Sequence, residues 1–235
     1  MPKFVDLHVL PRVEDEKSCR QMADLLRLAG YSTIGLTIPT GLLRERISFL
    51  RHIFQEAGIE TALRVDLSSG SRMELLRLLR RFRNSYDIIG VKCSNPGVAT
   101  VACRDRRVDV VFFDPRNHKV RFNHSLANLL RGAFEFNLLS TLLRETNGIF
   151  STITKQAVIA REHKVKVVLS SGSNVPGMVR SPSQIAALGS TIGLSKEQSA
   201  EGVSSTPRSI ITRNSSLRSS EYIEEGVRVV LPKAR

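Results

Sequence analysis

The sequence predicts an α/β protein with one β/α barrel of about seven parallel strands. Short runs rich in Val and Ile alternate with longer amphipathic stretches from the start of the chain to about residue 195, which is the pattern of repeated β/α units around a parallel sheet. The spacing of these runs is regular, which favours one closed unit. A chain of 235 residues that is 41% hydrophobic suits either one such barrel or two smaller domains, and a single domain is the simpler interpretation.

The strands are predicted from the apolar runs that open each unit. The first, Phe4–Val9, begins almost at the start of the chain. The full set of predicted strands covers residues 4–9, 32–38, 60–67, 86–92, 108–113, 133–137 and 165–170.

Helices are predicted between the strands from apolar spacing and from their end signals. Residues 17–29 and 41–57 each end at a glycine, Gly30 and Gly58, which is typical of a helix C-terminus. The stretch 72–83 has an apolar stripe at helical spacing. Shorter helices are expected at 125–131, at 183–188 with Ser181 as N-cap, and at 195–203. Residues 207–212 are a further apolar segment.

The domain organisation predicted from this pattern is one barrel over residues 1–213 and a mobile tail over residues 214–235. The stretch from Arg213 to Glu225 is rich in Ser, Asn and charged residues, and it has few apolar residues to bury.

The formal charge of +13 indicates a polyanionic partner. Of the 35 basic residues, 26 are arginine and 9 are lysine, and arginine is the side chain that pairs with phosphate oxygens in a bidentate manner. Solvated helix surfaces balanced by carboxylates explain individual basic residues but not the excess. An anionic membrane surface would need a helix with apolar anchors on one face, and the nearest candidate, 72–83, is interpreted as an ordinary packed helix.

The cysteines and the chain start predict a soluble, unexported protein. The three cysteines are scattered and form no Cys-x-x-Cys pair, which favours free thiols in a reducing compartment. No run of about 18 apolar residues appears, and no signal-peptide pattern precedes the first strand.

The first strand carries the one pattern that suggests a metal-dependent hydrolase. Asp6 and His8 lie on the same side of a strand and are both able to bind a metal ion. The partners available at later strand ends are few: Asp66, Asp114, and either His118 or His124. A one-metal site remains possible, but isolated Asp and His residues at strand ends more often hydrogen-bond to loops.

Other catalytic signatures are missing from the sequence: it has no phosphate-binding P-loop, dinucleotide-binding glycine motif, nucleophile elbow or His-Glu-x-x-His motif. The turn Ser170–Ser173 is able to hold a phosphate through its backbone N–H groups, although such a turn is more often only a turn.

Taken in order, these segments resemble the family of the thirty-kilodalton protein subunit of archaeal and eukaryotic ribonuclease P. The resemblance extends from about Phe4 to Asn214. The segments that carry it are Phe4–Val9, Ile88–Lys92, Val108–Asp114, Phe134–Asn137 with Leu138 and Leu139, Val167–Ser173 and Arg180–Pro182.

The resemblance implies a distorted, TIM-like barrel similar to the polymerase and histidinol phosphatase superfamily of metal-dependent phosphoesterases. Members of that superfamily open with Asp-x-His or His-x-His, and this chain has Leu10 two positions after His8, where a further histidine would be expected. The resemblance further implies that an RNA subunit removes the 5′ leader of precursor tRNA and that this chain is not the catalyst.

The partners implied by the resemblance are the ribonuclease P RNA and a small ferredoxin-like protein subunit, with precursor tRNA contacted indirectly and no membrane. Mg²⁺ would serve the RNA-catalysed holoenzyme, and this chain would bind no cofactor of its own. The expected location is the cytoplasm in an archaeon and the nucleus in a eukaryote.

The candidate RNA contacts are basic residues at strand ends and in the loops beyond them. Few aromatic residues accompany them, so recognition should depend on RNA shape and backbone rather than on base stacking. Arg64 has an alternative role as an internal barrel residue paired with Asp6 or Asp66. The predicted set is Arg64, Lys92, Arg106, Arg107, Arg180, Arg208 and Arg213.

Two alternatives remain open from the sequence. One is a metal-dependent phosphoesterase that uses Asp6, His8, Asp66 and Asp114. The other is a barrel enzyme of an unrelated family whose positive charge attracts a small anionic substrate. If the chain is instead an RNA-binding subunit, Asp6 and His8 should lie at the barrel mouth and be hydrogen-bonded to protein neighbours. The functional arginines should then surround that mouth.

Overall fold

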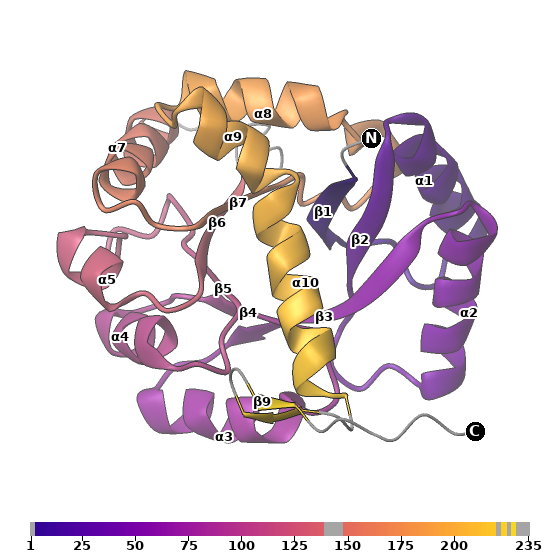
Figure 1. The fold of residues 1–235 in the computed structure, drawn as a ribbon, viewed down its shortest axis with the longest axis horizontal. Helices are drawn as coiled ribbons and strands as arrows, with labels where there is room; N and C mark the ends of the chain where they lie inside the picture. Colours follow the sequence, from indigo (N-terminus) through magenta and orange to yellow (C-terminus); the bar gives the residue numbers. More distant parts are fainter. Residues whose placement is uncertain (1–2, 139–147, 220–221, 225–226, 229–235) are drawn as a thin grey trace.

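Seven parallel strands form a nearly closed barrel in the computed structural model, which describes residues 3–138, 148–219, 222–224 and 227–228 (Figure 1). The strands follow one another around the barrel in chain order. They are β1 (Phe4–Val9), β2 (Tyr31–Thr37), β3 (Glu60–Ser68), β4 (Ile88–Lys92), β5 (Val110–Phe112), β6 (Ala133–Asn137) and β7 (Val167–Ser170). The TIM-like β/α barrel predicted from the sequence is confirmed.

The barrel closes between β1 and β7 through few main-chain contacts. A single parallel bridge joins Val9 to Ser173, and the Leu10 amide donates to the Ser173 carbonyl over 2.8 Å. The other neighbouring strands pair over two to five registered residue pairs, and β1 shows register shifts against β2. The seam between β1 and β7 is therefore the weakest part of the strand ladder.

The helices cover the outside of the barrel, and most begin at a side-chain cap. Ser181, for example, forms a capping box with Gln184, with Pro182 in the first turn, as the sequence predicted. The helices are α1 (Glu16–Leu28), α2 (Arg44–Glu56), α3 (Arg72–Phe82), α4 (Pro96–Arg104), α5 (His124–Leu129), α7 (Ile149–Glu162), α8 (Pro182–Thr191), α9 (Lys196–Gly202) and α10 (Ser205–Leu217), with a 3₁₀ turn, η1 (Pro176–Met178). Among the described residues, no helix is long and apolar enough to cross a membrane.

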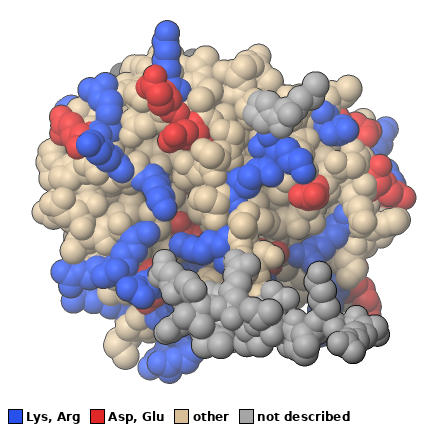
Figure 2. Space-filling view, in the orientation of Figure 1, with Lys and Arg blue, Asp and Glu red and all other residues tan. Residues whose placement is uncertain are grey.

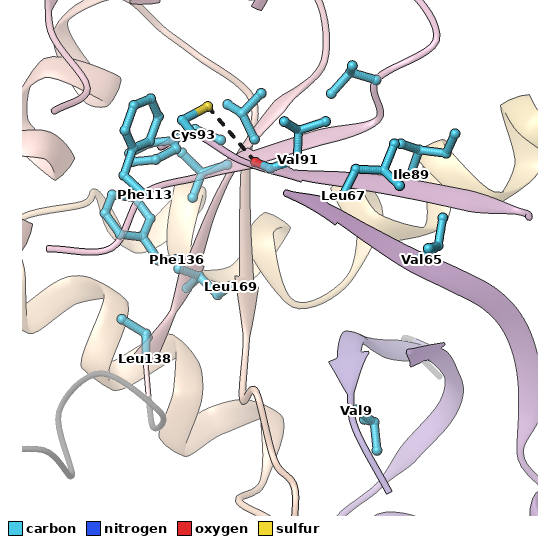
Figure 3. Close-up of a cluster of buried hydrophobic side chains, with 14 of the residues drawn as sticks. Val9, Val65, Leu67, Ile89, Val91, Cys93, Phe113, Phe136, Leu138 and Leu169 are labelled. Atoms are coloured by element: carbon cyan, nitrogen blue, oxygen red, sulfur yellow. Dashed lines mark hydrogen bonds between the residues drawn. The ribbon is translucent and has the colours of Figure 1, made fainter. Parts of the chain in front are cut away.

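The main core lies between the sheet and the surrounding helices. Alternate residues of neighbouring strands point outward into this layer, including Val65 and Leu67 of β3 and Ile89 and Val91 of β4 (Figure 3). Burying each such side chain contributes roughly 1.5–3 kcal/mol, which makes this layer the largest source of stability. All three cysteines are buried and free, in line with the sequence analysis.

A second, smaller core fills the inside of the barrel near the amino ends of the strands. It consists of Val5, Leu7, Ala62, Ile88, Val110, Ala133, Val168 and Ile210. Ile210 comes from α10, which crosses this end of the barrel in front of the strands (Figure 1). The amino end is therefore closed by a helix, whereas the carboxyl end remains accessible.

Helix α10 continues past residue 213, where the sequence analysis ended the barrel domain. The helix continues to Leu217, and Asn214 is only 2% exposed and donates to the Asp87 carbonyl over 2.8 Å. The Ser- and Asn-rich composition of this stretch suggested mobility, but its contacts with the barrel hold it in place. Beyond it lie two short paired strands, β8 (Tyr222–Glu224) and β9 (Val227–Arg228). Residues 220–221, 225–226 and 229–235 of the predicted tail lie outside the described residues.

Candidate functional site

A network of charged side chains, centred on Arg64, occupies the inside of the barrel. It lies closer to the carboxyl ends of the strands than the small apolar core does. Arg64 is 0% exposed. Its two terminal nitrogens each donate over 2.6 Å to a separate oxygen of Glu135, which is a bidentate pair, and Nε donates to Asp66 Oδ1 over 2.8 Å. One guanidinium therefore links β3 to β6 across the barrel interior.

Gly90 leaves the space that this network needs. A Cβ at position 90 would lie 2.3 Å from Asp66 Oδ1 and 2.9 Å from Arg64 Nη2. Any side chain on this residue of β4 would therefore displace the ion pair.

The ring of His8 belongs to the same network. Its Nε2 lies 2.9 Å from Asp66 Oδ2, and its Nδ1 lies 2.5 Å from Asn137 Oδ1. Burial and the nearby Arg64 act to lower the pKa of His8, but the carboxylates of Asp66 and Glu135 outweigh them and the pKa is raised. Asp66 shifts the other way: burial opposes its ionisation, but Arg64 and His8 together lower its pKa.

Asp6 has a separate role at the seam between β1 and β7. Its carboxylate accepts the Ser171 amide over 3.2 Å and the His8 amide over 3.1 Å. Burial raises the pKa of Asp6 despite these hydrogen bonds. Asp6 and His8 are both hydrogen-bonded to protein neighbours, as predicted, but their side chains serve different partners instead of converging on one point.

The mouth of the barrel, at the carboxyl ends of the strands, contains a cavity of about 270 Å³ lined in part by His8, Lys92, Asp114 and Arg116. Arg116 donates to both oxygens of Asp114, over 3.0 and 2.9 Å, and this holds the pKa of Asp114 at about 2. Lys92 Nζ lies 3.6 Å from the same carboxylate. Both cations at this cavity are therefore partly neutralised by one acid.

These residues do not fit a metal ion. Arg64 already supplies a fixed positive charge to Asp66, and Asp114 is paired with Arg116. His8 Nε2 faces Asp66, and the neighbouring carboxylates raise the pKa of His8. Among the described residues, no group of three His, Cys, Asp or Glu side chains is arranged to hold a metal.

The predicted RNA contacts lie at two opposite ends of the barrel instead of around one mouth. Lys92 ends β4, and Arg180 follows β7, so both belong to the carboxyl end. Arg106 and Arg107 precede β5, and α10 carries the other two, Arg208 and Arg213, so these four belong to the amino end.

Arg64 is not available to RNA because it has no exposed surface, and the structure replaces that prediction with the alternative of internal pairing. Asp66 was one of the partners expected for it, whereas Glu135 was not foreseen. RNA contact by the other six basic residues of the predicted set remains a prediction.

At the amino end, another buried carboxylate, that of Asp109, holds α10 against the barrel. Asp109 is 0% exposed and accepts hydrogen bonds from Arg83 over 2.7 Å, from the Ile89 amide over 2.7 Å and from Asn214 over 2.9 Å. Arg213 also pairs with it. This cluster was not identified from the sequence because its members lie up to 131 positions apart and only the fold brings them together.

Comparisons with known proteins give one consistent family. The family model described as RNase P subunit p30 matches residues 3–219. Ribonuclease P protein component 3 of Methanosarcina acetivorans is 26% identical over 235 residues, which covers 97% of this chain and 96% of that protein. The same-named protein of Methanothermobacter thermautotrophicus is 25% identical, with the same coverage of both chains.

Solved structures show the same fold. A chain in a cryo-EM structure of archaeal ribonuclease P with mature tRNA has a TM-score of 0.81 at 18% identity, covering 98% of this chain and 100% of that chain. A putative prolidase from Bifidobacterium longum has a TM-score of 0.53 at 12% identity over 91% of this chain and 70% of its own length, which is a likeness of barrel fold alone. With the family model covering almost the whole chain, this protein belongs to the RNase P subunit p30 family.

Proposed function

We propose that this chain is an RNA-binding, non-catalytic protein subunit of ribonuclease P, which supports a catalytic RNA in removing the 5′ leader of precursor tRNA. The observation that carries the proposal is the family match over residues 3–219. The charge of +13 supports an RNA partner, because a protein that neutralises several phosphates releases counterions and gains affinity.

The interior of the barrel supports the non-catalytic part of the proposal. In a metal-dependent phosphoesterase, the acids and histidines of the mouth would be free to bind metal ions and position water. Here Asp6, His8, Asp66 and Asp114 are all engaged by protein groups, and Arg64 stands among the carboxylates. We therefore assign Mg²⁺ to the RNA-catalysed holoenzyme and none to this chain, and the phosphoesterase alternative is not favoured.

The remaining partners follow from the same proposal. We expect a small ferredoxin-like protein subunit to bind this chain within the complex, and precursor tRNA to be reached through the RNA. The archaeal relatives fit a complex that works in the cytoplasm.

The salt dependence of RNA binding tests this function. Full-length protein is titrated against its ribonuclease P RNA over a series of KCl concentrations, and the logarithm of affinity is plotted against the logarithm of salt. Contacts with several phosphates predict a slope of several units. A shallow slope would contradict the RNA-binding role and would favour a barrel protein that binds a small anion.

A further inference from the structure

Two cavities at the amino end of the barrel adjoin each other and share Lys166. One, of about 230 Å³, is lined by Asp109, Arg131, Gly132, Ala133, Lys166, Ser209, Ile210 and Arg213. The other, of about 360 Å³, is lined by Lys166 and by Arg161, Lys164, Thr206 and five further residues. The first half of α10 forms a wall of both, through Thr206 in one and Ser209 in the other. We call these two neighbouring cavities together the amino-end groove.

The groove carries a strong excess of positive charge. Its lining includes five basic residues, Arg131, Arg161, Lys164, Lys166 and Arg213, against two acids, Asp109 and Glu201. Figure 2 views this end of the molecule and shows Lys and Arg side chains in a band on the left and centre, beside α10.

The acid at the centre of the groove, Asp109, offsets only part of this excess. The buried carboxylate of Asp109 is already shared by Arg83, Arg213 and Asn214. Within the described part of the chain, Arg131, Lys164 and Lys166 are exposed and form no ion pair with a carboxylate. Their charges are therefore available to an anionic ligand, whereas Lys92 and Arg116 at the mouth share Asp114.

The walls of the groove are held in place before any ligand binds. The Arg131 amide donates to the Cys103 carbonyl over 2.9 Å, and the Lys166 carbonyl accepts the Phe134 amide over 2.8 Å. Arg213 is fixed by Asp109, and Ile210 anchors α10 in the barrel interior. Cations on a fixed backbone lose less conformational entropy on binding than cations on a mobile loop.

We infer that the amino-end groove binds the phosphate backbone of RNA, at the end of the barrel opposite the cavity where barrel enzymes hold their substrates. The inference rests on the proposed function as an RNA-binding subunit. No aromatic residue lines either cavity, so the contact is made to phosphates and not by stacking on bases. Arg131, Lys164 and Lys166 are thereby added to Arg213 as RNA contacts.

A pair of matched double variants tests the groove. Arg131→Glu with Lys166→Glu reverses two groove charges. Arg44→Glu with Lys155→Glu reverses one arginine and one lysine that are exposed elsewhere, at the start of α2 and on α7. Arg213 is left unchanged because it also stabilises α10. Each full-length protein is titrated with the ribonuclease P RNA over the same salt series, and its thermal midpoint is recorded.

The groove variant should bind at least about tenfold more weakly, with a salt slope lower by about two units, whereas the control variant stays close to wild type. A neutral variant, Arg131→Gln with Lys166→Gln, should give a smaller loss of the same kind, and it keeps the test valid if the reversed charges disturb folding. Equal RNA affinity of the groove and control variants would contradict RNA binding by the groove, whether both affinities are unchanged or both are weakened. That outcome would leave the proposed function intact. The proposed function itself fails if the RNA affinity of the wild type does not depend steeply on salt.

Discussion

At the scale of single residues, Arg64 explains why a barrel with an Asp-x-His opening need not be a hydrolase. Its guanidinium lies among the carboxylates of Asp66 and Glu135 and provides the positive charge that a metal ion would otherwise supply. The sequence offered pairing of Arg64 with Asp6 or Asp66 as an alternative to RNA contact, but the contact with Glu135 joins residues 71 positions apart and required the fold.

Replacing Arg64 should test its structural role. Arg64→Met removes the bidentate partner of the buried Glu135 and leaves the partly exposed Asp66 with His8 alone. Breaking a buried ion pair such as that of Glu135 costs about 3–5 kcal/mol. We expect urea denaturation to show that loss, and Arg64→Met combined with Asp66→Asn and Glu135→Gln to recover most of it. If Arg64→Met instead kept its stability and lost RNA affinity, Arg64 would return to the set of RNA contacts.

The charge of His8 should make stability depend on pH. Because the folded pKa of His8 lies above its ordinary value of 6.5, the folded state holds the proton more tightly than the unfolded state. The contribution of His8 is complete below pH 6.5 and is lost as the pH rises through the raised pKa. The stability difference between wild type and His8→Gln, measured by denaturation across this range, should therefore shrink as the pH rises.

Of the two carboxylates that raise this pKa, Asp66 contributes more than Glu135, so the same comparison in an Asp66→Asn background should lose most of its pH dependence. An unchanged pH dependence in that background would show that another group is responsible.

At the scale of elements, the strands were predictable and the last helix was not. Each of the seven strands was expected within two residues of its observed ends, because a buried parallel strand needs a nearly continuous apolar run. Helix α10 lacks such a signal: residues 213–217 read Arg-Asn-Ser-Ser-Leu, and they are ordered by Asp87 and Asp109. Local composition cannot report contacts made with a distant carboxylate.

Asn214 should be important for stability in a way that a mobile tail would not be. Asn214→Ala removes its buried hydrogen bond to Asp109 and its partly buried hydrogen bond to the Asp87 carbonyl, and should destabilise the protein by about 1–3 kcal/mol. The neighbouring exposed residue provides the control, since Ser215→Ala should change the unfolding free energy by less than about 0.5 kcal/mol. Equal, negligible effects of both changes would restore the predicted boundary at residue 213.

Gly90 of β4 should tolerate no side chain. Gly90→Ala places a methyl group against Asp66 and Arg64 and should cost about 1–3 kcal/mol, the usual range for overpacking. Gly177 has no heavy atom within reach of an added Cβ, so Gly177→Ala is the matched control. Thermal unfolding of both variants should show almost no loss of stability for Gly177→Ala. A neutral Gly90→Ala would mean that the central network moves without cost.

At the scale of the whole molecule, the two ends of the barrel differ in chemistry. The carboxyl end holds a cavity whose charged groups are paired with one another. The amino end holds a helix and a groove in which Arg131, Lys164 and Lys166 form no ion pair with any described carboxylate. The family and its RNA partner were predictable from motifs in order and from the arginine excess. The placement of the basic residues was not, because the rule that barrels function at their carboxyl ends comes from enzymes.

Reconstitution of leader removal from precursor tRNA tests the central claim most directly. Cleavage is measured with the complete complex, with this chain omitted, and with this chain alone in Mg²⁺ or Mn²⁺. A non-catalytic subunit predicts full activity from the complex, a lower rate at physiological salt when the chain is omitted, and no cleavage by the chain alone. Cleavage by the isolated chain, or an unchanged rate without it, would contradict the account.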